Sequence, residues 1–321
     1  MNRVAPEQEE QDLSRAVPIG LNLGLGVGYL LLNLYLFFVL PIWLLPRNPW
    51  WGLTLIPVAA LNNPFWSLIH ETIHDLFHPA QRVNASFGRL LSILFGAPFR
   101  VLRLSHLLHH KLNRTPLEGT DLYDPEKSSK LRASLGYYSY IFGGLYLLEV
   151  LSPLLFFLPR RLLGRMQQRY FNGESLGGIW FKSLVNQEAV REVRTDGVLI
   201  LALLIVSFAC YGKDWQWLLG SLVARAFLVS FLDNVYHYRT PVNDVFYARN
   251  LWLPSLVSKA FLYFNLHGVH HKNPSIPWLR LPEVSAKGSE PFSANYFAAA
   301  LRQLYGPVAL LSLPSKQART V

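Results

Sequence analysis

The strongest constraint on this chain is a stretch without charge near its start. Residues 18–46, which read PIGLNLGLGVGYLLLNLYLFFVLPIWLLP, contain no Asp, Glu, Lys or Arg. This stretch is longer than the roughly 20 apolar residues that a helix needs to cross a bilayer. Charged residues make up only 16% of the 321 residues, against about 25% in ordinary soluble domains. We therefore expect an integral membrane protein.

Three further apolar runs complete a predicted set of four spans. The second run covers residues 51–69 and follows the first after a short loop. Residues 197–211 and 215–232 form the third and fourth runs and are joined only by a Gly-Lys-Asp sequence, which is typical of a turn. The sequence thus predicts an all-α membrane protein with four transmembrane helices arranged as two hairpins.

Basic residues are concentrated between the two predicted hairpins. Cytoplasmic loops of membrane proteins carry an excess of Lys and Arg, so we expect this connection and both termini in the cytoplasm, with the chain in a bacterial inner membrane. Residues 135–158 are apolar enough to span, but a crossing would put Arg160 and Arg161 on the wrong side, so we expect a helix in the membrane interface. The basic residues of the connection are Arg82, Arg89, Arg100, Arg103, Lys111, Arg114, Arg160, Arg161, Arg165, Arg169, Lys182, Arg191 and Arg194.

The chain is predicted to form one membrane domain over residues 17–283, with polar tails at 1–16 and 284–321. Its net charge of +10 is explained by contact with a membrane surface, and the basic residues form no motif for nucleic-acid binding. Cys210 is the single cysteine, which excludes a disulfide framework, a thiolate zinc site and a Cys-ligated iron–sulfur cluster. Any redox metal must therefore be bound by nitrogen and oxygen.

The histidines occur in three clusters and one isolated position. His70 and His74 lie in HETIH, HLLHH covers residues 106–110, HGVHH covers residues 267–271, and His237 stands alone. On a helix, residues three and four apart share a face, so each cluster directs several imidazoles to one point. In the predicted topology all four groups reach the cytoplasmic face, and we expect them to meet at one metal centre.

The number of ligands indicates how many metal ions this centre holds. Nine imidazoles exceed what one octahedral ion can bind, whereas two ions with four or five imidazoles each would use them all. Imidazole suits iron, zinc, copper and nickel alike, so ligand type alone does not choose the element. The tenth histidine, His78, is more typical of a surface or capping residue. The predicted ligands are His70, His74, His106, His109, His110, His237, His267, His270 and His271.

These motifs resemble those of the membrane fatty-acid desaturase and hydroxylase superfamily, which holds a non-haem di-iron centre with three histidine boxes. The resemblance rests on HETIH, on HLLHH with EGTDLYDP at 118–125, and on HGVHHKNPSIPWLRLPE at 267–283. It covers roughly residues 20–283. His237 is similar to the additional ligand that precedes the third box in acyl desaturases.

The resemblance implies two iron ions on a cytoplasmic helical cap over four spans, with further helices in the membrane interface. It also implies dioxygen as co-substrate, two electrons from an external donor, and a fatty acid or acyl thioester in a narrow apolar channel. Desaturases, hydroxylases, ketolases and the decarboxylases that make terminal alkenes from free fatty acids all belong to this superfamily. All begin by removing a hydrogen atom, so the sequence leaves the reaction open among them.

Acidic residues beside the histidines have candidate roles in the site. Metal-bound imidazoles usually donate their second N–H to a carboxylate or a carbonyl. This pattern favours Glu71 and Asp233 as catalytic-site carboxylates. Asp75, Asp121 and Asp124 are alternatives, although each also fits a solvated acid at a helix end.

Arg225 falls near the middle of the fourth predicted span, where a charge costs about 2.5–3.5 kcal/mol on insertion scales. It could clamp a substrate carboxylate, or it could be a structural partner for a backbone carbonyl or for Asn62 or Asn63. Asn62, Asn63 and Asn265 are candidate substrate contacts, or they are helix-packing groups.

The sequence contains no nucleotide-binding glycine pattern, cysteine cluster or haem motif, so electrons are expected from another protein. An acidic ferredoxin-like carrier would be attracted to the basic cytoplasmic face, although that face could also bind anionic membrane lipid.

Two other classes of protein compete with this interpretation. HETIH matches the HExxH motif of zinc proteases, but a hydrolytic zinc needs only three protein ligands, and the remaining clusters would then have no role. A membrane metal transporter would place its ligands near the bilayer midplane, whereas these clusters follow the predicted spans.

Overall fold

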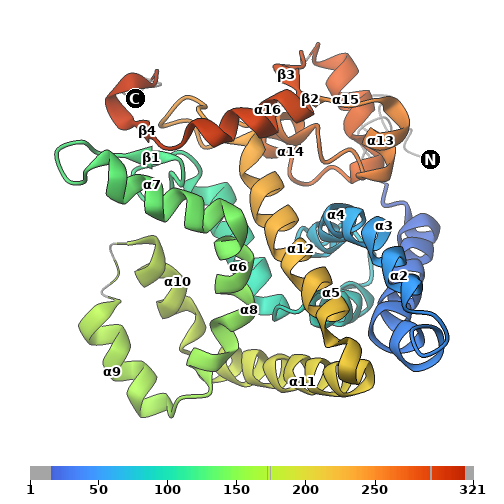
Figure 1. Ribbon diagram of the computed structural model, residues 1–321. Helices are drawn as coiled ribbons and strands as arrows, with labels where there is room; N and C mark the ends of the chain where they lie inside the picture. Colours follow the sequence, from blue (N-terminus) through green and yellow to red (C-terminus); the bar gives the residue numbers. More distant parts are fainter. Residues whose placement is uncertain (1–15, 172, 174, 290, 315–321) are drawn as a thin grey trace, which may run out of the picture.

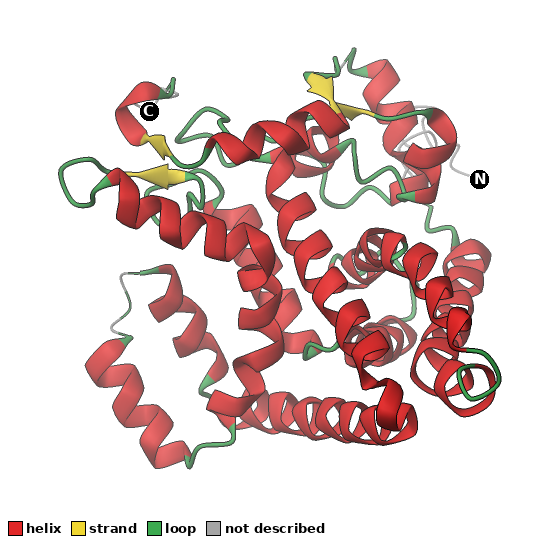
Figure 2. Ribbon diagram, viewed as in Figure 1, coloured by secondary structure: helices red, strands yellow, loops and turns green. Residues whose placement is uncertain are grey.

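The computed structural model describes residues 16–314, apart from residues 172, 174 and 290. Within this range the chain is mostly helical, and its strands are only two residues long (Figure 2). The predicted tail at 1–16 lies, apart from Ala16, outside the described residues.

The first part of the chain forms the helices that carry the first two histidine clusters. α2 continues directly into η1, and η2 into α3, whereas the other helices are separated by bends or short loops. In chain order the elements are α2 (Ile19–Leu34), η1 (Tyr35–Leu44), η2 (Pro49–Thr54), α3 (Leu55–Ala60), α4 (Asn62–Ile73), α5 (Gln81–Phe95) and α6 (Phe99–Leu112).

The middle of the chain contains the longest helices. α11 runs along the bottom of Figure 1, and α12 rises from its end through the centre of the molecule. After the short strand β1 (Leu122–Tyr123), the elements are α7 (Lys130–Ser139), η3 (Tyr140–Gly144), α8 (Leu145–Phe156), α9 (Arg160–Tyr170), α10 (Leu176–Leu184), α11 (Gln187–Tyr211), η4 (Gly212–Asp214), α12 (Trp215–Asp233) and η5 (Asn234–Tyr236).

The last part of the chain forms a layer of short elements at the upper end of α12 (Figure 1). Two parallel strand pairs, β1 with β4 and β2 with β3, belong to this layer. Its elements are β2 (Leu251–Trp252), α13 (Ser255–Ala260), α14 (His267–Lys272), η6 (Trp278–Arg280), α15 (Leu281–Lys287), β3 (Ala294–Asn295), α16 (Tyr296–Arg302), η7 (Gln303–Tyr305), β4 (Val308–Ala309) and η8 (Leu310–Ser312).

Much of the predicted tail at 284–321 is part of the fold. Tyr296, Ala299 and Ala300 are buried in the hydrophobic cluster that surrounds the end of α12. Gln303 is also buried: its side chain accepts a hydrogen bond from Asn234 at 2.8 Å and donates one to the carbonyl of Phe231 at 2.9 Å. The apolar run at 296–301 was the available signal, but it is far too short to predict a membrane span.

The described residues contain three helical stretches long and apolar enough to cross a membrane, or up to five if two bent helix pairs are each one span. The three are Ile19–Leu44, Lys130–Phe156 and Gln187–Tyr236. The second includes most of the segment 135–158, for which the sequence favoured an interfacial helix, so that segment also meets the requirements of a span. The arrangement of four spans in two hairpins stays a prediction.

A sharp turn at Gly96 directs α6 toward the histidine centre. α5 and α6 are bent by 99° at this point. Gly96 has φ +101°, a left-handed conformation that is strained for residues with a side chain. A Cβ added here would lie 2.9 Å from the Tyr146 hydroxyl oxygen. The turn therefore requires glycine both for its backbone and for the close approach of α8.

We expect Gly96→Ala to lower the free energy of unfolding by about 1–2 kcal/mol, because alanine is strained at positive φ and meets Tyr146. Unfolding in detergent titrated with sodium dodecyl sulfate measures the change. Gly220→Ala, in open space on α12, is the control and should not destabilise the protein. Equal stability of the two variants would contradict the role given to Gly96.

Candidate metal centre

The nine predicted imidazoles lie together in two groups. Within each group the candidate ligand atoms all lie within 4.8 Å of one another. The five-histidine group consists of His70, His74, His106, His110 and His270. The four-histidine group consists of His109, His237, His267 and His271. The convergence expected from the sequence is present, and the division into five and four matches the count for two ions.

Helices α6 and α14 each contribute to both groups. On α6, His106 and His110 are one turn apart and belong to the five-histidine group, whereas His109 belongs to the four-histidine group. On α14 the first and last histidines of HGVHH join the four-histidine group, and His270 joins the other. Residues four apart on a helix share a face more closely than residues three apart, so each HxxHH motif divides its imidazoles between two adjacent sites.

The imidazole nitrogens are close enough to share an ion. The Nε2 atom of His106 lies 2.9 Å from Nε2 of His74 and 3.0 Å from Nε2 of His110. Nε2 of His70 is buried and has no hydrogen-bond partner among the described residues. An unsatisfied buried polar group costs about 1–3 kcal/mol, which a bound cation would offset. The residues of both groups therefore fit metal ions with nitrogen ligands.

The protonation state of the three histidines on α14 supports metal binding. Burial lowers the pKa of His267, His270 and His271 well below its usual value, and the neighbouring imidazoles lower it further. These histidines are therefore neutral at neutral pH, which is the form whose nitrogen lone pair binds a metal.

A close backbone contact fixes the position of α14. The side chain of Asn250 accepts a hydrogen bond from the Val269 amide at 3.1 Å. Gly268 packs directly on the preceding loop: an added Cβ would lie 2.5 Å from the carbonyl oxygen of Ala248 and 3.0 Å from Oδ1 of Asn250. Only glycine at position 268 lets the third histidine cluster approach the other two this closely.

Gly268→Ala is expected to reduce bound metal to less than about half of the wild-type amount, because α14 must move away from the loop and take its three histidines with it. Metal analysis of the purified protein measures this. Gly164→Ala, in open space on α9, should bind the wild-type amount. Wild-type metal content in Gly268→Ala would contradict the claim that glycine is required at position 268.

Glu118 is a site residue that the sequence analysis missed. Its Oε1 atom lies 2.9 Å from Nδ1 of His109, so it can hold that ring with Nε2 toward the four-histidine group. Burial raises the pKa of the Glu118 carboxyl, but the charge and hydrogen bond of His109 outweigh it and hold the pKa below its usual value. Its place in EGTDLYDP was the available signal, and an acid nine residues from a histidine is too distant for simple helical spacing to identify.

The predicted carboxylates have different surroundings. Glu71 is buried; its Oε1 atom is 3.9 Å from Nδ1 of His70, and Oε2 accepts a hydrogen bond from the Trp278 amide at 3.2 Å. Glu71 therefore links the first histidine cluster to the segment after the third. Asp233 lines a cavity beside the histidines and is close enough to interact electrostatically with His109.

The three alternative carboxylates have structural partners instead. Asp75 pairs with Arg103, with Nη1 and Nη2 at 2.9 and 2.6 Å from its two oxygens. Asp121 pairs with the buried Arg114. Asp124 accepts a hydrogen bond from the Glu126 amide and pairs with Lys127, and the lysine lowers the pKa of the Asp124 carboxyl.

His78 lies outside both groups, as expected for a capping residue. Its Nδ1 atom accepts a hydrogen bond from the Ala80 amide at 2.9 Å, just before α5 begins.

The contacts of Arg225 match the structural role, which is one of the two that the sequence left open. The guanidinium is buried, its Nε donates to Oδ1 of Asn62 at 2.7 Å, and Nη1 donates to the carbonyls of Leu94 and Phe95 at 3.0 and 2.9 Å. Nη2 lies 3.4 Å from Oδ1 of Asn33. These bonds use the donors that a substrate carboxylate would need, so Arg225 joins α12 to α2, α4 and α5.

The asparagines predicted as substrate contacts also have structural roles. Asn62 accepts from Arg225, and Asn63 donates to the Leu228 carbonyl at 3.4 Å. Asn265 donates to the Leu251 carbonyl at 2.8 Å and is bonded to the Ser258 hydroxyl. None of the three lines the cavity described next, because their side chains face neighbouring segments of the fold.

We expect Arg225→Met to lower the free energy of unfolding by about 2–4 kcal/mol, since it leaves Asn62 and two buried carbonyls without donors. Arg161→Met, on the exposed side of α9, is the matched control and should change little. Unfolding in detergent measures both. An Arg225→Met variant of normal stability but weakened carboxylate binding would instead support a role of Arg225 in binding a substrate carboxylate.

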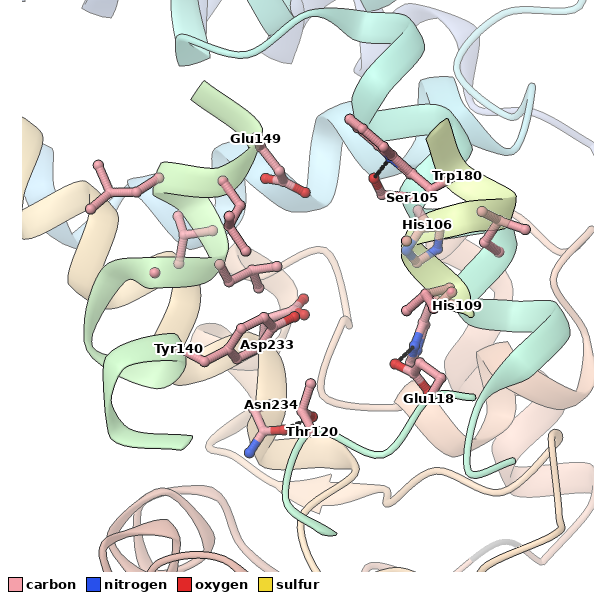
Figure 3. A pocket seen from close by; sticks show the side chains of 18 of the residues that line it. Ser105, His106, His109, Glu118, Thr120, Tyr140, Glu149, Trp180, Asp233 and Asn234 are labelled. Carbon is pink, nitrogen blue, oxygen red and sulfur yellow. Dashed lines mark hydrogen bonds and ion pairs between the residues drawn. The ribbon is translucent and has the colours of Figure 1, made fainter. Parts of the chain in front are cut away.

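A cavity of about 840 Å³ leads to the two histidine groups. Side chains from α6, α8, α10 and α12 form its walls, and most of them are apolar (Figure 3). His106 from the five-histidine group and His109, His237 and His267 from the four-histidine group reach its surface. Leu147, Leu148 and Leu151 of α8 line the cavity and are also 47–68% exposed on the outside of the protein.

Comparisons with known proteins agree with this geometry. The sequence model of the family described as "Fatty acid desaturase" matches residues 48–300, a range that contains all nine histidines. The chain is also similar to a beta-carotene ketolase of Paracoccus sp. (strain N81106 / MBIC 01143), with 24% identity over 249 residues, which is 74% of this chain and 78% of the relative. No solved structure matches the chain.

Proposed function

We propose that this chain, which belongs to the fatty acid desaturase family, is a membrane oxidoreductase that uses dioxygen and two iron ions to attack a C–H bond of a lipid chain. Family and relative indicate an oxidoreductase of the desaturase and hydroxylase superfamily. The observation that carries the proposal is the position of five and four imidazoles at the wall of an apolar cavity.

The two groups provide different settings for the two ions. Five nitrogen ligands would leave an octahedral ion one open position, and four would leave it two. Bound iron would supply the oxygen activation that starts the removal of a hydrogen atom. The protein's own part is to orient the imidazoles, with Glu118 fixing the His109 ring, and to exclude water through the apolar wall.

The cavity fits a lipid chain as substrate. Its volume is in the range of about 300–1,000 Å³ that is common for ligand pockets, and its apolar walls match a hydrocarbon. The exposed leucines of α8 allow entry from the membrane. We therefore propose oxidation of an acyl-type chain, by desaturation or hydroxylation. The ketolase relative supports oxidation to a ketone as a second candidate reaction.

Two earlier alternatives lose support. Oxidative decarboxylation of a free fatty acid would benefit from a cation to bind the carboxylate, and Arg225 is engaged elsewhere. A zinc protease needs three ligands from one site, whereas His70 and His74 share their group with three further imidazoles.

An electron donor remains necessary for this chemistry, and we propose an acidic ferredoxin-like protein. α9 presents four exposed arginines, Arg160, Arg161, Arg165 and Arg169, and a cluster of one sign accelerates the encounter with an oppositely charged partner. This proposal places the arginines and the histidine groups on the cytoplasmic side of a bacterial inner membrane.

His109→Ala and His270→Ala test the two groups separately. Each variant is expected to lose one of two bound irons and to reduce oxygen consumption, with a lipid and a reducing system present, by about 100-fold or more. His78→Ala, outside both groups, should keep iron and activity. Retained turnover in both His109→Ala and His270→Ala would contradict a shared centre.

Mass spectrometry of the product distinguishes the reactions within the proposal. Loss of two hydrogens identifies a desaturase, one added oxygen a hydroxylase, a ketone the second candidate, and an alkene one carbon shorter a decarboxylase.

A further inference from the structure

The cavity contains acidic groups but no available cation. Glu118, Asp233 and Glu149 all line it. Arg114 is the one Lys or Arg among the described lining residues, and its guanidinium is buried and occupied: it pairs with Asp121 and donates to the Thr240 carbonyl at 2.6 Å. Among the described lining residues, the cavity therefore offers no free Lys or Arg to a ligand.

Glu149 is the acidic group that the metal centre does not use. Glu118 is hydrogen-bonded to His109, and Asp233 is close to it. Glu149 belongs to α8, within the candidate span Lys130–Phe156, and Figure 3 shows its carboxyl group pointing into the cavity. No hydrogen bond or ion pair to this carboxyl group is present among the described residues.

An unpartnered carboxyl group is costly in this position. Acidic side chains inside a membrane cost about 2.5–3.5 kcal/mol on insertion scales and normally mark a functional site. Trp66 lies in the same wall and its indole N–H interacts with Asp233, so it does not compensate the Glu149 carboxyl group. The cavity is thus prepared for a ligand with a polar group.

We infer that Glu149 selects the substrate, and that the cavity takes an uncharged lipid bearing a hydroxyl group in preference to a fatty-acid carboxylate. This inference rests on the proposed function and names the substrate class of the same site. A hydroxyl group can form a hydrogen bond with the Glu149 carboxyl group, which has no other hydrogen-bond partner among the described residues.

A carboxylate ligand meets the opposite situation. It would bring a negative charge into an apolar cavity whose one arginine among the described residues is already engaged, and burying a charge without an opposite partner is costly.

Binding of matched ligands tests the inference without turnover. The full chain, loaded with iron and embedded in lipid nanodiscs without reductant, is titrated with hexadecanol, palmitate, hexadecane and hexadecylamine. Quenching of tryptophan fluorescence reports binding, because Trp66 and Trp180 line the cavity. We expect hexadecanol to bind about tenfold more tightly than hexadecane or palmitate, a difference of about 1.4 kcal/mol.

Substitutions at Glu149 identify the group responsible. Glu149→Leu should remove the preference for hexadecanol over hexadecane, and Glu149→Gln, which keeps the shape of the side chain and its capacity to hydrogen-bond a hydroxyl group, should retain that preference. Glu126→Leu, at an exposed position, is the control and should retain the wild-type order.

Three outcomes would overturn the inference. They are palmitate binding as tightly as hexadecanol, a hexadecanol preference that survives in Glu149→Leu, and hexadecylamine binding more tightly than hexadecanol, which would show that the cavity selects a cation. This experiment measures binding alone. The proposed function is tested separately, and wild-type protein that binds no iron or consumes no oxygen would contradict it.

Discussion

The structure depends on the clustering of nine imidazoles, six of them buried, whose nitrogens face one another. Neutral rings at these distances cannot satisfy every nitrogen by hydrogen bonding to each other, and Nε2 of His70 has no partner among the described residues. The unsatisfied nitrogens destabilise this arrangement unless another group binds them, and two cations at the centres of the groups would do so. The packing around the groups, including the glycine contact at position 268 and the turn at Gly96, serves to bring three separate helices to one place.

The division of the histidines between two sites follows from helix geometry. In each HxxHH motif the outer histidines share one face, and the middle one is rotated toward the neighbouring site. In α6 the outer histidines belong to the five-histidine group, and in α14 they belong to the four-histidine group. Each of the two helices therefore contributes ligands to both sites. This coupling explains why the two groups lie next to each other and why a single cavity reaches both. It also explains how nine ligands can come from so few elements.

The clustering of the histidines was largely predictable, since the spacing within each motif is local and helix geometry determines which rings share a face. The position of Glu118 was not, because it depends on how the loop after α6 folds back. Arg225 was recognised as a buried charge with two interpretations, and only the contacts with Asn62 and two carbonyls separated them. The spans were visible from hydropathy, but a run such as 135–158 meets the length requirement of a span while its charged neighbours argue against one. The packing of Gln303 and Tyr296 depends on contacts remote in sequence, which no local pattern reveals.

Anomalous diffraction at the iron absorption edge from crystals of the purified protein tests the central claim most directly. The account predicts two peaks, one among the five imidazoles around His270 and one among the four around His109. A single peak shared by both groups, or peaks that appear at the zinc edge and not at the iron edge, would contradict it.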